Sequence, residues 1–483
     1  MARLVVVSNR VPSIAERGQQ TGGLAVALED ALKREALWFG WSGRIAETTS
    51  EAPTMTLKGR ITIATIELGQ EDYQRFYVGF SNSILWPLLH YRLGLVDYVR
   101  EDYRGYRTVN RRFASALSPL LRPDDIVWVH DYHLIPLGTE LRRLGHANRV
   151  GFFLHIPFPP GGVFKALPCA SELLSDLAAY DIVGFQTLED RGNFLDSMSQ
   201  LTDATVRNGT VQLDGNLAKA VAIPVGIDPD RFARLAERSA RSEYSHRLRE
   251  SLAGRKLIIG ADRLDYSKGL INRFTGFSQL IERFEQHRLK VSYLQITPRS
   301  RKDVSDYQSL KRSLDRLAGK INGSFAEFDW VPLRYMTKAM PRNILAGFYR
   351  LANVGLVTPF RDGMNLVAKE FIAAQDPEDP GVLVLSQFAG AAASLDEALQ
   401  INPHDTEEIA EALHSALMMP IDERRARWTS LIAKVRSDSA AAWSQRFLAE
   451  LENERAARPR IASAVTGERR VQTQRATLMP NAT

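Results

Sequence analysis

Ten residues in the second half of the chain combine an acidic turn, a glycine and the start of a helix. They read RDGMNLVAKE at 361–370 and follow VGLVTP, a short β-branched run typical of a buried parallel strand. With Asn365 as the expected N-cap, the N–H groups of Leu366 and Val367 could bind a diphosphate at the positive end of the helix. Glu370, one turn further, could accept both hydroxyls of a ribose. The alternative is an ordinary strand-to-helix turn with an exposed acid.

A second polar loop follows an apolar strand within KLIIGADRLDYSKGL at 256–270, and we expect Ser267 to open the next helix. Loops at the carboxyl ends of parallel strands are where α/β proteins hold ligands. Arg263 and Lys268 lie in this loop, where two fixed cations could neutralise a diphosphate and stabilise it as a leaving group. Because two aspartates adjoin these cations, ordinary surface ion pairs are the alternative.

Five motifs together resemble trehalose-6-phosphate synthases, in that family's order and spacing. They are FGWSG at 39–43, HDYHL at 130–134, HIPFP at 155–159, RLDYSKG at 263–269 and RDGMNLVAKE at 361–370. The resemblance extends from about residue 2 to about residue 450. It implies an α/β protein of the GT-B class, in which two facing Rossmann-like domains with parallel sheets enclose an interdomain cleft. Members of the family are retaining glycosyltransferases that move glucose from a nucleotide sugar to glucose 6-phosphate, giving α,α-trehalose 6-phosphate.

Alternating strand and helix patterns also predict parallel sheets flanked by helices. The expected strands are 4–7, 126–129, 150–155, 182–186, 257–260, 291–296, 354–358 and 382–385, with helices at 24–34 and 304–317. We expect an N-terminal acceptor-binding domain at 1–230, a C-terminal nucleotide-sugar-binding domain with closing helices at 231–456, and a disordered basic tail at 457–483. The boundary follows a last strand and a proline-bearing turn within 220–232.

The resemblance assigns a role to each residue at a matching motif position. The donor-binding positions are Gly22, Gly23, Arg263, Lys268, Met340, Asp362, Leu366, Val367, Ala368, Lys369 and Glu370. The acceptor-binding positions are Arg10, Tyr77, Trp86, Asp131 and Arg301. Two arginines suit a phosphate monoester, because guanidinium groups bind it bidentately. Trp86 and Ile156 match positions of anomer selectivity, and the expected catalytic set is Asp131, His155, Arg263, Lys268 and Asp362.

The expected mechanism follows from the charge that develops when glucose C1 leaves the nucleotide phosphate. Arg263, Lys268 and the helix start at Leu366 would stabilise the departing diphosphate without a metal. A double displacement needs a carboxylate nucleophile near C1, and the sequence does not identify one. The resemblance implies instead a front-face substitution in which a leaving-phosphate oxygen helps to deprotonate the acceptor hydroxyl. Asp362 is then a ligand of sugar hydroxyls.

We expect no metal and no cofactor. His130 and His133 are close in sequence, but no third ligand follows at a recognisable spacing. Asp228-Pro229-Asp230 resembles the metal-binding Asp-x-Asp of other glycosyltransferases, but its proline predicts a turn.

Composition is that of an ordinary globular protein, with 45% apolar and 24% charged residues among 483. No apolar run approaches about 18 residues and the single Cys169 suits a reducing compartment, so we expect a cytoplasmic protein that does not contact membranes. The tail from Ala457 has five arginines and one glutamate, which supply +4 of the net +6 and argue against a nucleic-acid-binding body. The resemblance implies UDP-glucose and glucose 6-phosphate as partners, a homodimer or homotetramer, and a role in osmoprotection.

Two positions depart from the family pattern. Pro160-Gly161-Gly162 replaces a Ser or Thr with a nearby Glu, which changes the start of the next helix beside the acceptor site. Met340 replaces an aromatic residue that lies near the nucleotide base in some relatives, and the sequence leaves uracil, guanine and adenine open. The alternatives are a related glucosyltransferase with another acceptor, such as glycerol 3-phosphate, and a catalytically silent sugar-phosphate sensor. An NAD-dependent dehydrogenase is disfavoured because no G-x-G-x-x-G follows a strand.

Overall fold

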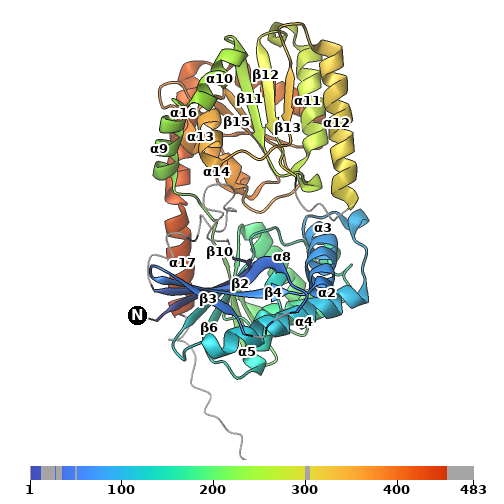
Figure 1. Ribbon diagram of the computed structural model, residues 1–483, viewed down its shortest axis with the longest axis vertical. Coiled ribbons are helices and arrows are strands. Elements are labelled where there is room, and N and C mark those ends of the chain that lie inside the picture. The colour runs from blue at the N-terminus through green and yellow to red at the C-terminus, as the bar shows by residue number, and fades with distance from the viewer. Residues whose placement is uncertain are drawn as a thin grey trace, which may run out of the picture.

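A computed structural model describes residues 2–11, 28, 35–48, 50, 52–299 and 305–453. These residues form two α/β domains, each built around its own sheet, which lie one above the other in Figure 1. Gly22, Gly23, Arg301 and the tail at 457–483 lie outside the described residues, and so does the helix expected at 24–34, apart from residue 28.

The first domain contains a ten-stranded sheet that is parallel at its centre and antiparallel at both edges. Its strands are β1 (Leu4–Arg10), β2 (Ala36–Ile45), β3 (Thr54–Lys58), β4 (Ile61–Leu68), β5 (Ile126–His130), β6 (Arg149–Phe153), β7 (Ile182–Phe185), β8 (Thr205–Arg207), β9 (Thr210–Leu213) and β10 (Asn216–Ala222). Their order is β3-β4-β2-β1-β5-β6-β7-β10-β9-β8. The four strands expected in this half are confirmed as β1, β5, β6 and β7, and the last strand expected before the boundary is confirmed as β10. The additional strands are β2, β3, β4, β8 and β9, and pairing is antiparallel at β3–β4 and at β8–β9–β10.

Both faces of this sheet are buried, which explains the unbroken apolar run at the start of β1. Val5 and Val7 pack against a layer of helices, whereas Leu4 and Val6 belong to the core on the opposite face. The helical segments of this domain are α2 (Gln70–Asp72), the π-helix η3 (Tyr73–Leu85), α3 (Trp86–Leu89), η4 (Leu93–Leu95), α4 (Arg100–Leu117), η5 (Ser118–Leu120), η6 (Tyr132–Leu134), α5 (Leu137–Arg143), α6 (Gly161–Phe164), α7 (Ala170–Leu177) and α8 (Leu188–Leu201).

The second domain contains a six-stranded parallel sheet, in the order β13-β12-β11-β14-β15-β16. Its strands are β11 (Lys256–Ala261), β12 (Val291–Ile296), β13 (Leu333–Met336), β14 (Val354–Val357), β15 (Val382–Ser386) and β16 (Leu399–Ile401). The helical segments that follow the first domain are α9 (Pro229–Ser239), α10 (Glu243–Leu252), η7 (Tyr266–Lys268), α11 (Leu270–Arg283), η8 (Glu285–His287), α12 (Ser305–Phe325), α13 (Arg342–Leu351), α14 (Leu366–Ala374), η9 (Gly390–Ala393), α15 (Thr406–Met418), α16 (Ile421–Ser437) and α17 (Ala440–Asn453). The four strands expected here are confirmed as β11, β12, β14 and β15, and this sheet is the second parallel sheet that the expected architecture requires.

Two local predictions are wrong. Ser267 does not open a helix, because it lies inside η7, and α11 begins only after Gly269, whose φ of +64° is in the left-handed region. Asp228-Pro229 is not a turn but the start of α9. The Asp228 side chain accepts the N–H of Arg231 at 2.9 Å, and proline occupies the first helical position.

The last described helix, α17, returns the chain to the first domain (Figure 1). Its Trp443 and Phe447 rings pack on Trp128 of β5, with centroids 4.8 and 4.7 Å apart. Lys219 of β10 also pairs with Glu450 of α17 at 2.8 Å. The sequence-based division placed this helix with the second domain at 231–456, whereas its contacts lie on the first sheet. The position of the boundary at residue 230 stays a prediction.

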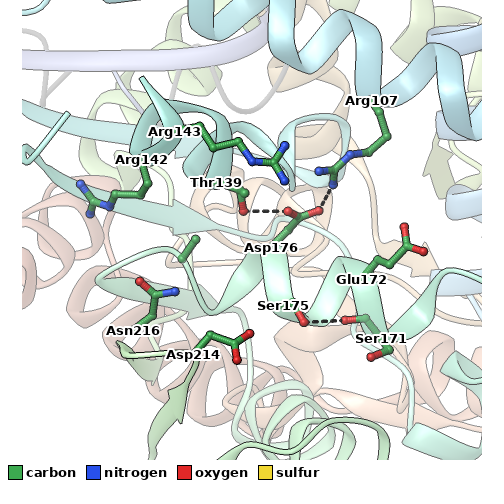
Figure 2. A pocket seen from close by; sticks show the side chains of 11 residues that line it. Arg107, Thr139, Arg142, Arg143, Ser171, Glu172, Ser175, Asp176, Asp214 and Asn216 are labelled. Atoms are coloured by element: carbon green, nitrogen blue, oxygen red, sulfur yellow. Dashed lines mark hydrogen bonds and ion pairs between the residues drawn. The ribbon is translucent and has the colours of Figure 1, made fainter. Parts of the chain in front are cut away.

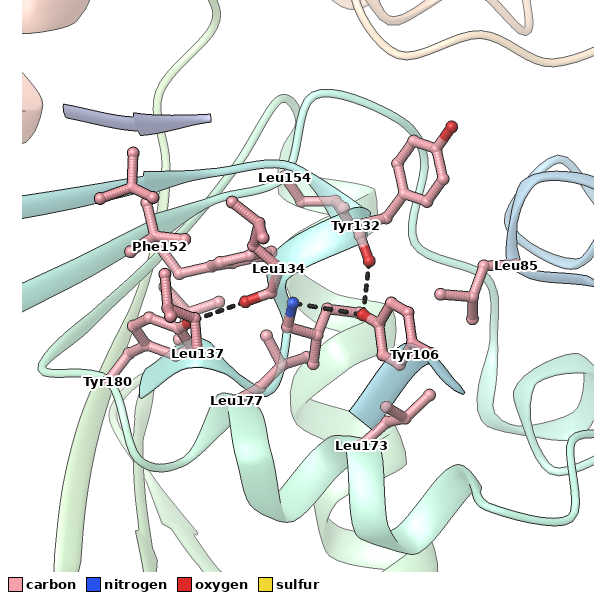
Figure 3. Packing of buried hydrophobic residues seen from close by; sticks show 14 of the residues in the cluster. Leu85, Tyr106, Tyr132, Leu134, Leu137, Phe152, Leu154, Leu173, Leu177 and Tyr180 are labelled. Carbon is pink, nitrogen blue, oxygen red and sulfur yellow. Dashed lines mark hydrogen bonds between the residues drawn. The ribbon is translucent and has the colours of Figure 1, made fainter. Parts of the chain in front are cut away.

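Two buried tyrosines hold the loop that follows β5 (Figure 3). Tyr106 donates its hydroxyl to the carbonyl of Tyr132 at 2.7 Å, and Tyr180 donates to the carbonyl of Leu134 at 2.8 Å. Burial raises the pKa of both phenols well above its ordinary value, so both remain protonated donors. The loop begins at Asp131, and these two bonds therefore fix the base of an expected site residue.

Tyr106→Phe should lower the free energy of unfolding by about 1–3 kcal/mol, because it leaves the buried carbonyl of Tyr132 without its donor. Urea denaturation of the two proteins measures the difference. Tyr244→Phe, at a side chain that is about half exposed, is the matched control and should leave the midpoint unchanged. Equal midpoints for Tyr106→Phe and the control would contradict the role of this bond.

Candidate active site between the two domains

The helix expected to receive a diphosphate has the predicted N-terminus. Asn365 is confirmed as the N-cap of α14, with its side chain accepting the N–H of Ala368 at 3.3 Å. Helix geometry leaves the N–H groups of Leu366 and Val367 without an intrahelical acceptor. Asn365 has a φ of +64°, which asparagine tolerates better than most residues, so the turn before α14 is sharp.

Lys268 and Asp362 meet in the cleft as a buried ion pair. The Lys268 Nζ lies 2.5 Å from Asp362 Oδ2, and Asn365 donates to the same oxygen at 3.0 Å. Burial would raise the pKa of Asp362, but the nearby ammonium outweighs it and holds that pKa below its usual range. The expected donor-side cation and carboxylate thus form one charged unit at the ends of β11 and β14.

Arg263 extends from the second domain over an aromatic ring of the first. Its Cζ lies 5.9 Å from the centroid of the Trp86 ring, a distance compatible with a cation–π contact. Trp86 is almost fully buried and lies at the start of α3. The expected diphosphate ligand and the expected acceptor-pocket tryptophan are therefore direct neighbours across the cleft.

Asp131 occupies a rare backbone conformation at the end of β5. Its φ is +77° and its ψ is 163°, a region that costs a non-glycine residue on the order of 1–3 kcal/mol. The Asp131 N–H donates to the carbonyl of Phe153 at 2.9 Å, and Oδ1 accepts the N–H of His155 at 3.2 Å. These bonds join the ends of β5 and β6 and bring the two expected sugar ligands together.

His155 packs among aromatic rings two residues beyond β6. Its Nε2 lies 3.1 Å from Nδ1 of His130, and its ring contacts Trp443 of α17. Burial lowers the pKa of His155 to about 3, so its imidazole is neutral near pH 7. A neutral ring can bind a sugar hydroxyl without adding charge beside the departing phosphate.

The acceptor side is bounded by aromatic rings and by Arg10. Tyr77 stacks on His133 with centroids 5.9 Å apart and also contacts Trp41 of the FGWSG motif. Arg10, at the end of β1, packs over Gly43, where an added Cβ would lie 2.6 Å from the arginine Nε. Because Gly43 has no side chain, it leaves the space that the Arg10 guanidinium occupies. The anomer-selectivity pair Trp86 and Ile156 are both buried on this side.

The two domains touch through backbone at Gly363. A Cβ built on Gly363 would lie 1.9 Å from the carbonyl oxygen of His155 and 3.2 Å from the Cα of Ile156. Beside this contact, Arg361 donates to the hydroxyl of Tyr91 at 2.8 Å. The loop that carries Asp362 is thus pressed directly against the loop that carries His155.

Three expected donor-binding residues of α14 are engaged elsewhere. The N–H of Ala368 is taken by Asn365, so it does not point freely into the cleft. The ammonium of Lys369 donates to the carbonyl of Val225 in the segment that links the two domains, at 2.9 Å. Oε1 of Glu370 accepts two bonds from Arg342, at 3.0 and 2.8 Å, which leaves Oε2 as the oxygen that could bind ribose.

The remaining expected positions are placed as follows. Met340 is half-buried in the loop before α13, close to Arg342 in sequence. Pro160-Gly161-Gly162 forms the start of the four-residue helix α6, with Pro160 at its N-cap. That this start differs from that of the family stays a prediction.

Sequence reasoning missed Arg342 and His90 near the expected site residues, and it missed a second contact of Asn365. Asn365 was expected only as a cap, but it also orients Asp362; Arg342 orients Glu370; and His90 lies against Trp86 with centroids 4.1 Å apart. Nδ1 of His90 donates to the carbonyl of Trp86 at 2.8 Å, and its buried Nε2 has no hydrogen-bond partner among the described residues. The signal available in the sequence was the position of His90 four residues after Trp86, on the same helical face.

A polar pocket lies on the first domain and contains none of the expected site residues (Figure 2). Its central carboxylate, Asp176, accepts hydrogen bonds from Arg107 and from Thr139, the latter at 2.7 Å. Arg107 also pairs with Glu140 at 3.4 Å. These bonds join α4, α5 and α7, so the pocket's charges are already used in holding helices together.

Within residues 2–453, apart from the undescribed gaps, no group of three His, Cys, Asp or Glu side chains could hold a metal ion. No helix in the same described part is both long and apolar enough to cross a membrane.

Comparisons with known proteins place this geometry in a family. Residues 2–453 match the family model described as Glycosyltransferase family 20. A Sodalis glossinidius protein named trehalose-6-phosphate synthase is 45% identical over 472 residues, which cover 97% of this chain and 100% of the relative.

Two solved structures are similar over nearly the whole chain. A UDP-forming α,α-trehalose-phosphate synthase from Burkholderia xenovorans, in complex with glucose-6-phosphate, shows 47% identity and a TM-score of 0.91, covering 93% of this chain and all of the other. A structure from E. coli described as trehalose-6-phosphate bound with UDP-2-fluoro glucose shows 44% identity and a TM-score of 0.89, covering 93% and 99%.

Gly363→Ala should reduce turnover at least 10-fold, because the new methyl group collides with the backbone of His155 and the two loops must separate. Displacements of about 1 Å at a reacting centre can cost about 10² in rate. Gly192→Ala is the control, since an added Cβ there meets nothing within 4 Å. Steady-state rates of the two variants measure this effect. Equal turnover of Gly363→Ala and Gly192→Ala would contradict the tight contact between Gly363 and the backbone of His155.

His90→Gln should flatten the pH dependence of stability between pH 6.5 and 5. Burial lowers the pKa of His90 to about 4, whereas an unfolded histidine titrates near 6.5. The unfolded chain therefore binds more protons in this range, and the stability contributed above pH 6.5 is lost as the pH falls towards 4. Over this interval, the unsubstituted protein should lose roughly 1.5 kcal/mol more than the variant in urea denaturation. Parallel pH profiles would show that His90 is not held neutral by burial.

Proposed function

The chain belongs to glycosyltransferase family 20, and we propose that it transfers glucose from UDP-glucose to glucose 6-phosphate with retention of configuration. The products are α,α-trehalose 6-phosphate and UDP, so the reaction serves trehalose biosynthesis. The observation that carries the proposal is that Arg263 of the second domain lies over Trp86 of the first, while Gly363, next to the Lys268–Asp362 ion pair, lies against the carbonyl of His155. Similar proteins hold glucose-6-phosphate or UDP-2-fluoro glucose.

The donor side lies on the second domain. The N–H groups of Leu366 and Val367 bind the diphosphate of the nucleotide, supported by the positive end of the α14 dipole. Arg263 and Lys268 add two cations at the neighbouring strand end. Glu370, oriented by Arg342, binds the ribose hydroxyls through Oε2. This division follows the rule that parallel sheets bind ligands at the carboxyl ends of their strands.

The acceptor side lies on the first domain. Arg10 binds the phosphate of glucose 6-phosphate, with Arg301 as the second expected arginine. Tyr77 and Trp86 cover the sugar ring, and Asp131 accepts a hydrogen bond from one of its hydroxyls. Tyr106 and Tyr180 fix the loop that begins at Asp131, so Asp131 holds the acceptor in a defined position between the domains.

Transfer requires charge to move from the glucosyl group to the phosphate. The bond between C1 and the phosphate oxygen breaks, the ring becomes positive, and Arg263, Lys268 and the α14 N-terminus stabilise the negative diphosphate. The acceptor hydroxyl attacks from the same face, and its proton passes to a leaving-phosphate oxygen. Asp362 and neutral His155 bind hydroxyls of the donor sugar and hold C1 in place.

Further properties complete the proposal. The positive charge that the reaction needs is supplied by the chain itself, so we propose activity without a metal or another cofactor. The single Cys169 and the absence of long apolar runs from the sequence support a cytoplasmic location. We also propose a homodimer or homotetramer and a role in osmoprotection, from the resemblance to the family.

The direct test is UDP release by the purified protein from UDP-glucose and glucose 6-phosphate in the presence of EDTA. Release should require the acceptor, and NMR of the product should show an α,α linkage. Glycerol 3-phosphate replaces the acceptor in a parallel reaction. UDP release with glycerol 3-phosphate but not with glucose 6-phosphate would show that the acceptor is glycerol 3-phosphate. No release with UDP-, GDP- or ADP-glucose would favour the silent sensor.

Lys268→Met should lower turnover by about 10² to 10³, because it removes one preorganised cation from the leaving diphosphate. Lys311→Met removes a lysine that pairs with Asp315 on the surface of α12, and it should leave the rate unchanged. The same UDP-release assay compares both variants. A loss below 3-fold for Lys268→Met would contradict its assigned role.

A further inference from the structure

Lys369 stands on the donor helix but points away from the donor. Its side chain is about 1% exposed, and its Nζ donates to the carbonyl of Val225 at 2.9 Å. Val225 belongs to the segment between β10 and α9, through which the chain passes from the first domain to the second. A residue of α14 is thus bonded directly to the interdomain linker.

The same linker peptide is held from the other side by the first domain. The N–H of Val225 donates to Oε1 of Gln186 at 3.0 Å, and Gln186 follows β7 directly. Nε2 of Gln186 donates in turn to the carbonyl of His155 at 3.4 Å. That carbonyl is the atom pressed against Gly363 in the cleft.

The linker has little freedom to move at this point. A Cβ on Gly226 would lie 1.7 Å from the carbonyl of Asp438, in the second crossing between the domains. The Ala440 N–H donates to the carbonyl of Ile227 at 2.9 Å and ties the two crossings together. Displacements at Val225 are therefore transmitted to its bonded partners rather than absorbed by slack backbone.

A buried ammonium is an expensive way to fill this space. Burial lowers the pKa of Lys369 to about 8, partly offset by Asp438, because taking the charge out of water disfavours it. An apolar side chain of the same length would avoid that cost. What the lysine adds is a directional bond of fixed length between α14 and one carbonyl.

We propose that Lys369 and Gln186 are positioning residues that hold the Val225 peptide from opposite sides and so set the position of donor helix α14 relative to His155. The proposal rests on the proposed function for the identity of the donor. Lys369 does not touch the substrate in this account. It acts through the linker, and its loss misaligns two halves that each remain able to bind their own ligand.

The test compares Lys369→Met, which keeps the length but removes the donor, with Lys369→Arg, which restores an N–H donor. Lys219→Met is the matched control, because Lys219 also joins the first domain to a later segment, through an exposed pair with Glu450. Calorimetric titration gives the UDP and glucose 6-phosphate affinities, and UDP release gives kcat. Hydrogen exchange of the 223–227 peptide reports how firmly Lys369 and Gln186 hold the Val225 peptide, which we call the clamp, and it does not depend on the reaction.

Lys369→Met should lower kcat at least 10-fold, change either ligand affinity by less than 3-fold, and speed exchange of the linker peptide at least 10-fold. Lys369→Arg should recover part of kcat, and Lys219→Met should match the unsubstituted protein. Gln186→Met should reproduce the same split, and the double variant should lose no more than about 3-fold beyond the worse single variant, because both residues act on one peptide.

Three outcomes overturn the proposal. Unchanged kcat and exchange in Lys369→Met would show a residue that only fills space. A loss of UDP affinity as large as the loss of kcat would show that Lys369 supports donor binding through α14 itself and not through the linker. If Lys369→Met does not fold, an unchanged kcat in Gln186→Met rejects the clamp. If the unsubstituted protein releases no UDP, the proposed function fails. Hydrogen exchange of the 223–227 peptide would then still test whether Lys369 and Gln186 hold the Val225 peptide.

Discussion

The site depends on a contact between backbones, where Gly363 of the second domain lies against the carbonyl of His155 in the first. No side chain fits between them, so two loops from separate sheets are held at van der Waals distance. Asp362 directly precedes Gly363, and the side chain of Asp131 accepts the N–H of His155. Ligands bound to different domains can therefore meet at one reacting centre, which a looser interface would not ensure.

The electrostatics of the cleft follow from this closeness. Lys268 and Asp362 are buried together, so this cation is fixed in a region that water enters poorly, whereas Arg263 is exposed where it lies over Trp86. Fixed charges in such a region stabilise a developing diphosphate more strongly than mobile charges in water. Neutral histidines complete the pattern. His90 and His155 offer hydrogen-bonding nitrogens without competing for the negative phosphate.

Local patterns in the sequence predicted much of this arrangement. A strand, a polar loop and a capped helix are encoded by neighbouring residues, so β14, Asn365 and the start of α14 were predictable, as were the loop positions of Arg263 and Lys268. Tertiary partners were not predictable in this way. The return of α17 to the first sheet, the bond from Lys369 to Val225 and the pairing of Arg342 with Glu370 join residues far apart in the chain. They depend on tertiary packing within and between the two domains, which no short pattern records.

The central claim is that one cleft holds the donor on the second domain and the acceptor on the first. A crystal structure of the protein with UDP and glucose 6-phosphate tests it most directly. The account predicts the diphosphate within hydrogen-bonding distance of the N–H groups of Leu366 and Val367, beside Arg263 and Lys268, with the sugar phosphate on Arg10. A nucleotide bound outside the cleft, or both ligands held by a single domain, would contradict it.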